Sequence, residues 1–422
     1  MKEKLNKQER IKLRDKKQNE FIEDYFKNIE KYPSITFKMG TGIGKTWIAL
    51  KIAAKLQAES PDIKIALAVP TTNLIDKKGN QSWWKEIEEF NKVNENKVDA
   101  TKIEAHTIAK WQMQDNEGEI PHYDLFIVDE VHNSLSKVRS KMYKKYTWDK
   151  LIGLSATIPT EKEKKLEKIA PIRYRYSIDN AIDDGLLPEY IVYKVGITLS
   201  RTANIKRTNK KGEVKLWSEY SWHKFLNESM EKNRKILYAN NLSPLEVISG
   251  KINYKRLPKH VSQAAFFYRW AQQERIKLYR NSSSKLSKAK NILATLDRAF
   301  VFCGSIEQAQ DVTEGDTDLQ YHSKRNAKEN TETLNNFNEE IINIIATSKK
   351  LNEGANLKNV EKAVILYCNS SAGQLIQRIG RSMRGDEPEI FVIYVKDSAD
   401  ANNALSALNG IAEKRIKNYT NE

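Results

Sequence analysis

Short runs of apolar residues recur along the chain, and each is followed by small or polar residues. The runs lie at 35–37, 63–69, 125–128, 151–154, 300–304 and 341–345. Near-continuous apolar runs of this length are typical of parallel strands covered on both faces. After the first run, Ile48, Ile52 and Leu56 recur at helical spacing and predict a helix. The pattern therefore predicts open parallel sheets flanked by helices.

A glycine-rich turn joins the first strand to this helix. Its sequence is Gly40-Thr41-Gly42-Ile43-Gly44-Lys45-Thr46. Such a turn points several backbone N–H groups at one spot, which favours a polyphosphate. We expect Lys45 to reach the β- and γ-phosphates and the Thr46 hydroxyl to ligate Mg²⁺. The usual pattern opens with glycine where this chain has Met39, and a glycine-rich turn without a ligand is the alternative interpretation.

Polar residues follow the next buried strands. In an open α/β sheet, ligands bind at the edge where the strands end. Two adjacent carboxylates in an apolar setting, such as Asp129 and Glu130, repel each other and need a cation or a catalytic task. We predict that Asp129 holds Mg²⁺ through water and that Glu130 activates the attacking water. An ordinary strand exit with two acids is the alternative. Ser155 and Thr157 would bond this pair or cap a helix.

Length and composition limit the class of protein. The 422 residues are enough for two or three domains. No apolar run is long enough to cross a bilayer, so we expect no membrane partner. The charged N-terminus is unlike a secretory signal. Cys303 and Cys368 lie in or beside apolar runs and are predicted to be buried, reduced thiols. The expected location is the cytoplasm, or the host cytoplasm for a viral protein.

Positive charge is concentrated in one segment. The chain has a net charge of +16, and residues 201–290 alone hold 21 Lys and Arg against 6 Asp and Glu, a local net charge of +15. Aromatic residues are interleaved with these cations, a combination that suits phosphates and stacked bases. The turn at 209–212 predicts a cationic hairpin. A solvated basic face over an aromatic core is the alternative to nucleic-acid binding.

The motifs of the first half resemble, in order, those of the motor domain of superfamily 2 helicases of the DExH type. Gly40–Thr46 resembles motif I, Pro70-Thr71 motif Ia, Thr107 motif Ib, Asp129-Glu130-Val131-His132 motif II, and Ser155-Ala156-Thr157 motif III. Gln18 stands where many members have a glutamine that reads adenine, although a surface glutamine is equally compatible with the residues alone.

The second half continues the resemblance. Gly304 resembles motif IV, Gly354 and Asn356 motif V, and Gln377-Arg378-Ile379-Gly380-Arg381-Ser382-Met383-Arg384 motif VI. Many relatives have aspartate at the position of Asn356, where it holds the ribose. The resemblance implies that Arg381 and Arg384 are arginine fingers and that Gln377 senses the γ-phosphate. It also implies nucleic-acid contacts from Pro70, Thr71, Thr107, Gly304, Thr347 and Arg378, and coupling by His132, Ser155 and Thr157.

The family pattern implies two tandem RecA-like domains, at 1–195 and 283–422, separated by a basic, mainly helical insert at 196–282 that contacts nucleic acid. The implied activity is that of an ATP- and Mg²⁺-dependent DNA helicase or translocase, acting on branched DNA as phage recombination helicases do. DNA is favoured over RNA, and no protein partner can be identified. The alternatives are an RNA helicase, the motor subunit of a restriction complex, and a non-enzymatic annealing or scaffold protein.

Overall fold

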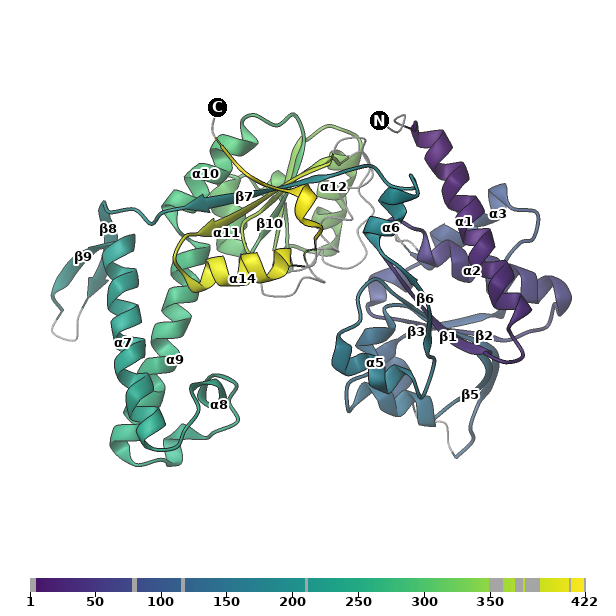
Figure 1. The fold of residues 1–422 in the computed structure, drawn as a ribbon, viewed down its shortest axis with the longest axis horizontal. Coiled ribbons are helices and arrows are strands. Elements are labelled where there is room, and N and C mark those ends of the chain that lie inside the picture. Colours follow the sequence, from purple (N-terminus) through teal and green to yellow (C-terminus); the bar gives the residue numbers. More distant parts are fainter. Residues whose placement is uncertain are drawn as a thin grey trace.

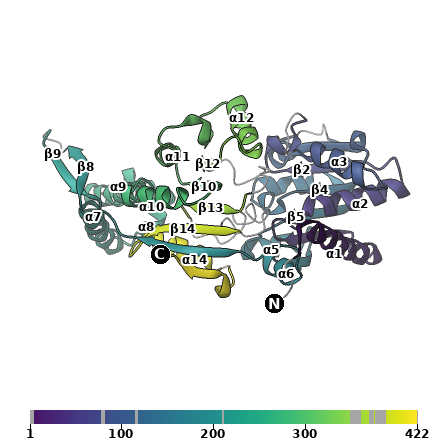
Figure 2. The same cartoon turned by 90° about the horizontal axis from the view of Figure 1, so that it is seen from above.

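The computed structural model describes residues 5–77, 82–114, 118–208, 212–348, 360–368, 375, 388–409 and 411–420. The chain forms two lobes, and a long helical hairpin projects from the second (Figure 1). The first lobe, the second lobe and the two-stranded hairpin of the insert (203–218) follow one another along the long axis of the molecule (Figure 2). Two RecA-like domains with a basic insert are therefore confirmed.

Lobe 1 is built on a six-stranded parallel sheet with the order β3-β2-β4-β5-β1-β6. Its strands are β1 (Ser34–Met39), β2 (Ile65–Val69), β3 (Ile103–Thr107), β4 (His122–Val128), β5 (Thr147–Ser155) and β6 (Ile172–Tyr176). Its helices are α1 (Lys7–Lys27), α2 (Lys45–Glu59), α3 (Trp83–Val93), α4 (Ile108–Met113), α5 (Thr160–Leu166) and α6 (Ile178–Asp183). β2 is buried along its whole length, as its apolar sequence predicts.

Lobe 2 contains a seven-stranded parallel sheet with the order β11-β12-β10-β13-β14-β7-β15. Its strands are β7 (Ile191–Ile197), β10 (Ala299–Cys303), β11 (Gln320–Tyr321), β12 (Ile344–Ser348), β13 (Lys362–Ile365), β14 (Glu389–Val395) and β15 (Ile416–Asn418). Its helices are α10 (Ser283–Leu293), α11 (Ile306–Val312), α12 (Ala327–Asn338) and α14 (Ala399–Leu408). Because β7 pairs with β14 and β15, a boundary at residue 195 falls inside a strand of lobe 2.

The insert combines a hairpin with a helical bundle. Its elements are β8 (Ala203–Thr208), β9 (Val214–Ser218), α7 (Glu219–Ala239), α8 (Pro244–Ile248) and α9 (Lys259–Arg280). β8 and β9 are antiparallel, so the hairpin expected around 209–212 is present. α7 and α9 pack together around an apolar core that includes Leu226, Val247 and Ala265 and continues to Val395 of β14. This core holds the helices of the insert together and joins them to lobe 2.

One buried carboxylate joins the two chain segments at the base of the insert. Glu219, the first residue of α7, accepts hydrogen bonds from the Ser200 backbone N–H at 3.1 Å and from the Ser282 hydroxyl at 2.9 Å. It also accepts bonds from the backbone and hydroxyl of Ser283. Ser200 precedes β8 and Ser283 opens α10. The carboxylate therefore holds the insert against lobe 2.

A second buried charge, Arg415, joins the lobes. It lies just before β15 and forms an ion pair with Asp179 of α6 and another with Glu189, whose Oε2 is 3.2 Å from Arg415 Nε. Only 2% of its side chain is exposed. The guanidinium also lies over the ring of Tyr190. Since α6 closes lobe 1 and Arg415 belongs to lobe 2, this cluster is a direct contact between the lobes near their connection.

Both cysteines are buried, as predicted. Within the described residues, no helix combines the length and apolar character that a membrane span requires.

Candidate active site

The glycine-rich turn lies between β1 and α2, and its backbone conformation depends on glycine. Gly42 and Gly44 have φ of +86° and +85°, in the left-handed region that side chains disfavour. A Cβ on Gly44 would lie 2.4 Å from Gln18 Nε2, so there is no room for one. Gly44 is also the residue that precedes α2, and no side chain caps this helix end. The turn therefore presents backbone N–H groups at the start of a helix, as phosphate binding requires.

Gln18 lies directly beneath this turn. Its side chain is buried, and Nε2 donates to the Ile43 carbonyl at 2.8 Å. The Gly44 carbonyl is 3.5 Å from the same nitrogen. The amide thus supports the shape of the turn from α1. Reading of adenine by Gln18 stays a prediction.

Two side chains of the turn fit a polyphosphate. The Thr41 hydroxyl oxygen is buried and has no hydrogen-bond partner within the part of the chain that the structure describes. Buried hydroxyls are rarely left unpaired, so an acceptor or donor is expected there. Among the described residues, Lys45 Nζ has a single hydrogen bond, a long one of 3.5 Å to the Gly40 carbonyl. Its positive charge acts on both Asp129 and Glu130, which places the lysine between the turn and the acids.

Asp129 follows β4 and faces the turn. Its Oδ1 accepts the Glu130 backbone N–H at 2.9 Å, and its Oδ2 accepts the Trp83 indole N–H at 3.3 Å. Burial, and then the negative charge of Glu130, raise the pKa of Asp129 to about 6, although Lys45 opposes the shift. A carboxylate in this state is stabilised by a cation, because the cation removes the cost of the buried charge.

The pKa of Glu130 is shifted in the opposite direction from that of Asp129. Burial works against its charge, but hydrogen bonds from His132 and Ser155, together with the charge of Lys45, outweigh burial and lower its pKa. The Ser155 hydroxyl lies 3.2 Å from Glu130 Oε2 and 2.8 Å from His132 Nδ1. Glu130 also has φ of +45°, which is rare for a residue with a side chain. Such backbone conformations are maintained by their surroundings and concentrate at functional sites.

The structure therefore brings together several residues that the sequence singled out separately. Ser155 ends β5, which pairs with β1 and β4, and its hydroxyl also lies 2.9 Å from the Thr157 carbonyl. The hydroxyl has one hydrogen, so it donates to Glu130, to the Thr157 carbonyl, or to His132 Nδ1 when that nitrogen carries no proton. A change of acceptor would change the charge balance at Glu130. The sequence offered capping as an alternative for Ser155; the observed contact is with the acid.

The nucleic-acid residues expected in lobe 1 lie at one edge of its sheet. Pro70 and Thr71 follow β2 and Thr107 ends β3, and Val69 is paired with Thr107 in the register of the two strands. The Thr107 hydroxyl caps α4 by accepting the Lys110 backbone N–H at 3.2 Å. That bond leaves a second lone pair for another donor. Thr71 and Thr107 are therefore close enough to act on neighbouring groups of one ligand.

Lobe 2 has a corresponding edge. Thr347 of β12 is paired with Phe302 of β10, and Gly304 follows β10 directly. The Thr347 hydroxyl oxygen is buried and has no hydrogen-bond partner within the described ranges. A Cβ on Gly304 would lie 2.7 Å from the Tyr367 ring, so the backbone there passes close to an aromatic side chain. Six expected site residues lie outside the described ranges: Gly354, Asn356, Gln377, Arg378, Arg381 and Arg384.

Sequence reasoning missed the part that Trp83 plays. The ring of Trp83 is buried. However, its indole N–H donates to Asp129, which orients that carboxylate. A buried indole N–H needs an acceptor, and this requirement was the available signal. Lys162 is a further case, since its Nζ donates to the His132 carbonyl at 3.0 Å and supports the loop after the acidic pair.

Two family models match the chain. Residues 10–160 match the type III restriction enzyme, res subunit, and residues 284–386 match the helicase conserved C-terminal domain. A curated relative, the DNA 3′-5′ translocase XPB2 of Sulfurisphaera tokodaii, is 23% identical over 382 residues, which is 87% of this chain and 78% of the relative. The two matched regions fall in lobe 1 and lobe 2 and contain the motifs described above.

Solved structures share the fold. The helicase domain of Hef from Pyrococcus furiosus has a TM-score of 0.53 and 16% identity, with 90% of this chain and 96% of that chain covered. The type ISP restriction-modification enzyme LlaBIII bound to DNA has a TM-score of 0.54 and 14% identity over 94% of this chain and 30% of that chain. Saccharomyces cerevisiae Dbp5 bound to RNA has a TM-score of 0.52 and 12% identity over 92% of this chain and 85% of that chain.

The order of the motifs, the two parallel sheets and the two family models agree with the resemblance noted in the sequence. The annealing or scaffold alternative, which required no enzyme, is therefore excluded by the family. The chain belongs to superfamily 2 of the helicases and translocases and is an ATP-hydrolysing enzyme.

Proposed function

We propose that this enzyme is a Mg²⁺-dependent DNA translocase that couples ATP hydrolysis between its lobes to movement on branched DNA. The observation that carries the proposal is the acidic pair beside the phosphate-binding turn. Two adjacent carboxylates whose pKa values are moved in opposite directions have different tasks. Asp129 is suited to binding a cation, and Glu130 is suited to accepting a proton.

The tasks follow from the contacts. Asp129, oriented by Trp83 and by the Glu130 backbone, would hold a magnesium ion through water, and Thr46 at the start of α2 would provide a hydroxyl ligand. A bound magnesium ion would neutralise charge on the phosphates. Glu130 stays ionised and accepts the proton of the attacking water. Lys45 completes the site from the turn.

Arginines of the second lobe would complete the site. Arg381 and Arg384 are three residues apart, so in a helix they would lie on one face and act on one phosphate. Because these arginines belong to a different lobe from Lys45 and Glu130, hydrolysis would depend on how the lobes are placed. Ser155 and His132 would transmit this placement through their bonds to Glu130.

The DNA part of the proposal rests on charge and on the sheet edges. The insert carries most of the net charge of the chain, and the unpaired Thr347 hydroxyl lies at the edge of lobe 2. A phosphate backbone satisfies both features. XPB2, the curated relative, is a DNA translocase, which favours DNA over RNA for this chain. Branched DNA is favoured because the insert projects beyond lobe 2, where a second duplex arm would lie.

The deciding experiment is an ATPase titration against single-stranded DNA, duplex DNA, a fork, a four-way junction and RNA. We expect stimulation by DNA, strongest with the fork or junction. The Lys45→Ala and Glu130→Gln variants should lose stimulated hydrolysis while still binding DNA. Stimulation by RNA alone would refute the choice of DNA, and equal stimulation by all DNA forms would refute the preference for branches.

The contribution of the insert is best tested with point variants, since deletion would expose the buried contacts of Glu219. Lys206 and Lys215 are exposed cations on the two strands of the hairpin. Changing both to Gln should reduce the salt dependence of junction binding by about one unit of slope per lost phosphate contact. An unchanged slope would show that the hairpin does not contact DNA.

A further inference from the structure

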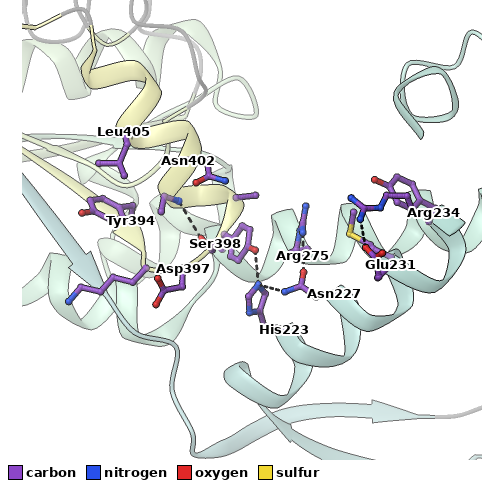
Figure 3. A pocket seen from close by; sticks show the side chains of 16 residues that line it. His223, Asn227, Glu231, Arg234, Arg275, Tyr394, Asp397, Ser398, Asn402 and Leu405 are labelled. Carbon is purple, nitrogen blue, oxygen red and sulfur yellow. Dashed lines mark hydrogen bonds and ion pairs between the residues drawn. The ribbon is translucent and has the colours of Figure 1, made fainter. Parts of the chain in front are cut away.

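A large cavity lies where the insert meets lobe 2, away from the ATP site. Its volume is about 830 Å³, which is within the range of ligand pockets. Three walls enclose it: α7, α9, and the end of β14 with the turn that follows it and α14. Figure 3 shows His223, Asn227 and Arg275 on one side and Tyr394 and Leu405 on the other. We call this cavity the junction pocket.

Cations of the junction pocket come from all three elements. Arg234 is on α7, Arg275 is on α9 and Lys396 follows β14. Two acids, Glu231 and Asp397, also line the pocket, so the formal charge of these five side chains is +1. His223 adds no charge, because burial and then Arg275 lower its pKa. A pocket with this balance suits a singly charged anion.

Arg275 is positioned by a chain of hydrogen bonds. Its Nη1 donates to Asn227 Oδ1 at 3.0 Å, and the Asn227 amide lies 3.0 Å from His223 Nε2. The Tyr279 hydroxyl is 2.8 Å from the same histidine nitrogen. The Nε of Arg275 is buried and has no hydrogen-bond partner among the described residues. A guanidinium with a fixed orientation and a buried, unused donor is a recognition group for an oxyanion.

Lys396 is also directed by its surroundings. A Cβ on Gly196 of β7 would lie 2.7 Å from Lys396 Cε, so the aliphatic stem of the lysine crosses the space that this glycine leaves open. No acidic side chain lies within ion-pair distance of Lys396 among the described residues. The opposite wall offers Tyr394 and Leu405, whose apolar surfaces are partly or largely exposed. The pocket therefore combines directed cations with an aromatic surface.

The junction pocket lies on the edge of lobe 2 that carries Gly304 and Thr347. All strands of this sheet are parallel, so β10, β12 and β14 end at the same edge. Arg280, at the end of α9, lies 4.4 Å from the Tyr367 ring and next to Gly304. Arg275 is five residues earlier on the same helix, about 7.5 Å along its axis. A strand bound at Gly304 would reach the pocket within a short distance.

We propose that the junction pocket binds one phosphodiester and its attached base from a single nucleic-acid strand that continues past Gly304. The inference rests on the proposed function, because that function places a strand on this edge. Arg275 and Lys396 hold the phosphate, and Tyr394 provides a face for the base. The charge of +1 matches one phosphodiester better than a doubly charged terminal phosphate. A strand held here leaves the path between the lobes at the base of the insert.

The test is equilibrium binding of fluorescent single-stranded DNA of increasing length to the full chain, without ATP. In the wild-type protein, affinity should rise at the length that first reaches the pocket. The Arg275→Leu variant should lose about tenfold in affinity for longer strands and nothing for shorter ones. Asn402→Trp, which fills the pocket from α14 without touching the hydrogen-bond chain, should have the same effect. Lys235→Gln, an exposed charge on α7 outside the pocket, is the matched control and should leave affinity unchanged.

The outcomes separate this inference from the proposed function. If the wild-type protein binds no strand and no nucleic acid stimulates its ATPase, both are overturned. Should the wild type bind and be stimulated while Arg275→Leu and Asn402→Trp bind long strands normally, only the pocket assignment is wrong. A dinucleotide arm covers the other source of a phosphate: if thymidylyl-thymidine, which carries one singly charged phosphodiester, displaces the long strand only from the part of its affinity that depends on the pocket, the site recognises a nucleotide unit as proposed. Saturable binding of the dinucleotide that Arg275→Leu abolishes, with strand binding intact, would refute a strand site.

Discussion

Replacement of Asp129 by Asn should stabilise lobe 1 at neutral pH while it abolishes ATP hydrolysis. The wild-type carboxyl has a pKa raised to about 6 in the folded protein from an ordinary value of 3.8. When the pH rises through this interval, the unfolded chain releases a proton that the folded chain keeps. The free energy of unfolding therefore falls between about pH 4 and pH 6 and stays lower above it. Asparagine carries no charge and avoids this penalty.

The magnitude follows from the shift and from the hydrogen bonds. A shift of about two pKa units corresponds to about 3 kcal/mol of unfolding free energy. Asparagine has one acceptor oxygen where aspartate has two, so either the Trp83 indole or the Glu130 N–H loses its acceptor. That loss costs about 1–1.5 kcal/mol. The Asp129→Asn variant should thus be more stable than the wild type by about 1–2 kcal/mol at pH 8.

Hydrogen exchange followed by mass spectrometry in increasing urea would measure the stability of lobe 1 separately from that of lobe 2. The advantage of Asp129→Asn should be present at pH 8 and absent at pH 4, where the wild-type carboxyl is already protonated in the folded state. Glu119→Gln, on the exposed surface, removes the same charge and should shift stability little at either pH. A variant that is less stable than the wild type at pH 8, or that keeps its advantage at pH 4, would refute the reasoning.

Three other predictions concern hydrogen-bonded charges. Ser155→Ala removes a hydrogen bond that lowers the pKa of Glu130, so the pKa of Glu130 should rise. The acid limb of the pH–rate profile of the ATPase should then move to higher pH, and kcat at pH 7 should fall about tenfold. An acid limb that does not move would contradict the assignment. Glu219→Gln leaves N–H and O–H donors at the base of the insert without acceptors. The free energy of local opening at 281–285, measured by hydrogen exchange, should fall by about 2–4 kcal/mol. Unchanged exchange would argue against a joint at Glu219. Lys285 is fully buried and pairs with Asp400 at 2.7 Å, so Lys285→Met should destabilise lobe 2 by about 3–5 kcal/mol in urea unfolding, whereas a double variant with Asp400→Asn should recover part of this loss.

The sequence predicted the sheets because their signal is local. A short apolar run such as 63–69 is typical of a buried strand. The turn at 40–46 needs positive φ at Gly42 and Gly44, and the glycines themselves indicate this. The acids after β4 were also predictable, since their position at a strand end follows from the apolar run before them. In each case the information lies within about ten residues.

What the sequence did not predict depends on contacts between distant segments. The partnership of Ser155 with Glu130 requires the strand order that sets β5 beside β4, and the sequence left capping as an equal alternative. β7 was placed in the first domain, which was predicted to end at residue 195, but its partners β14 and β15 come some two hundred residues later. Pairing at that separation leaves no local pattern to read.

The joint at Glu219 determines how motion of the lobes reaches the insert. Because Glu219 binds both segments at the base of α7, the insert must follow lobe 2 when the lobes change position. α7 has 21 residues and is about 31 Å long, so a rotation of lobe 2 by about 10° would carry its far end through about 5 Å. The junction pocket is formed by the insert and lobe 2 together, so it moves with lobe 2 as one unit. A strand held in the pocket would therefore stay bound to lobe 2 during each cycle, while the far end of the insert, at α8, sweeps past whatever lies beside it. Under the proposed strand site, binding and displacement would therefore take place at opposite ends of one helical hairpin.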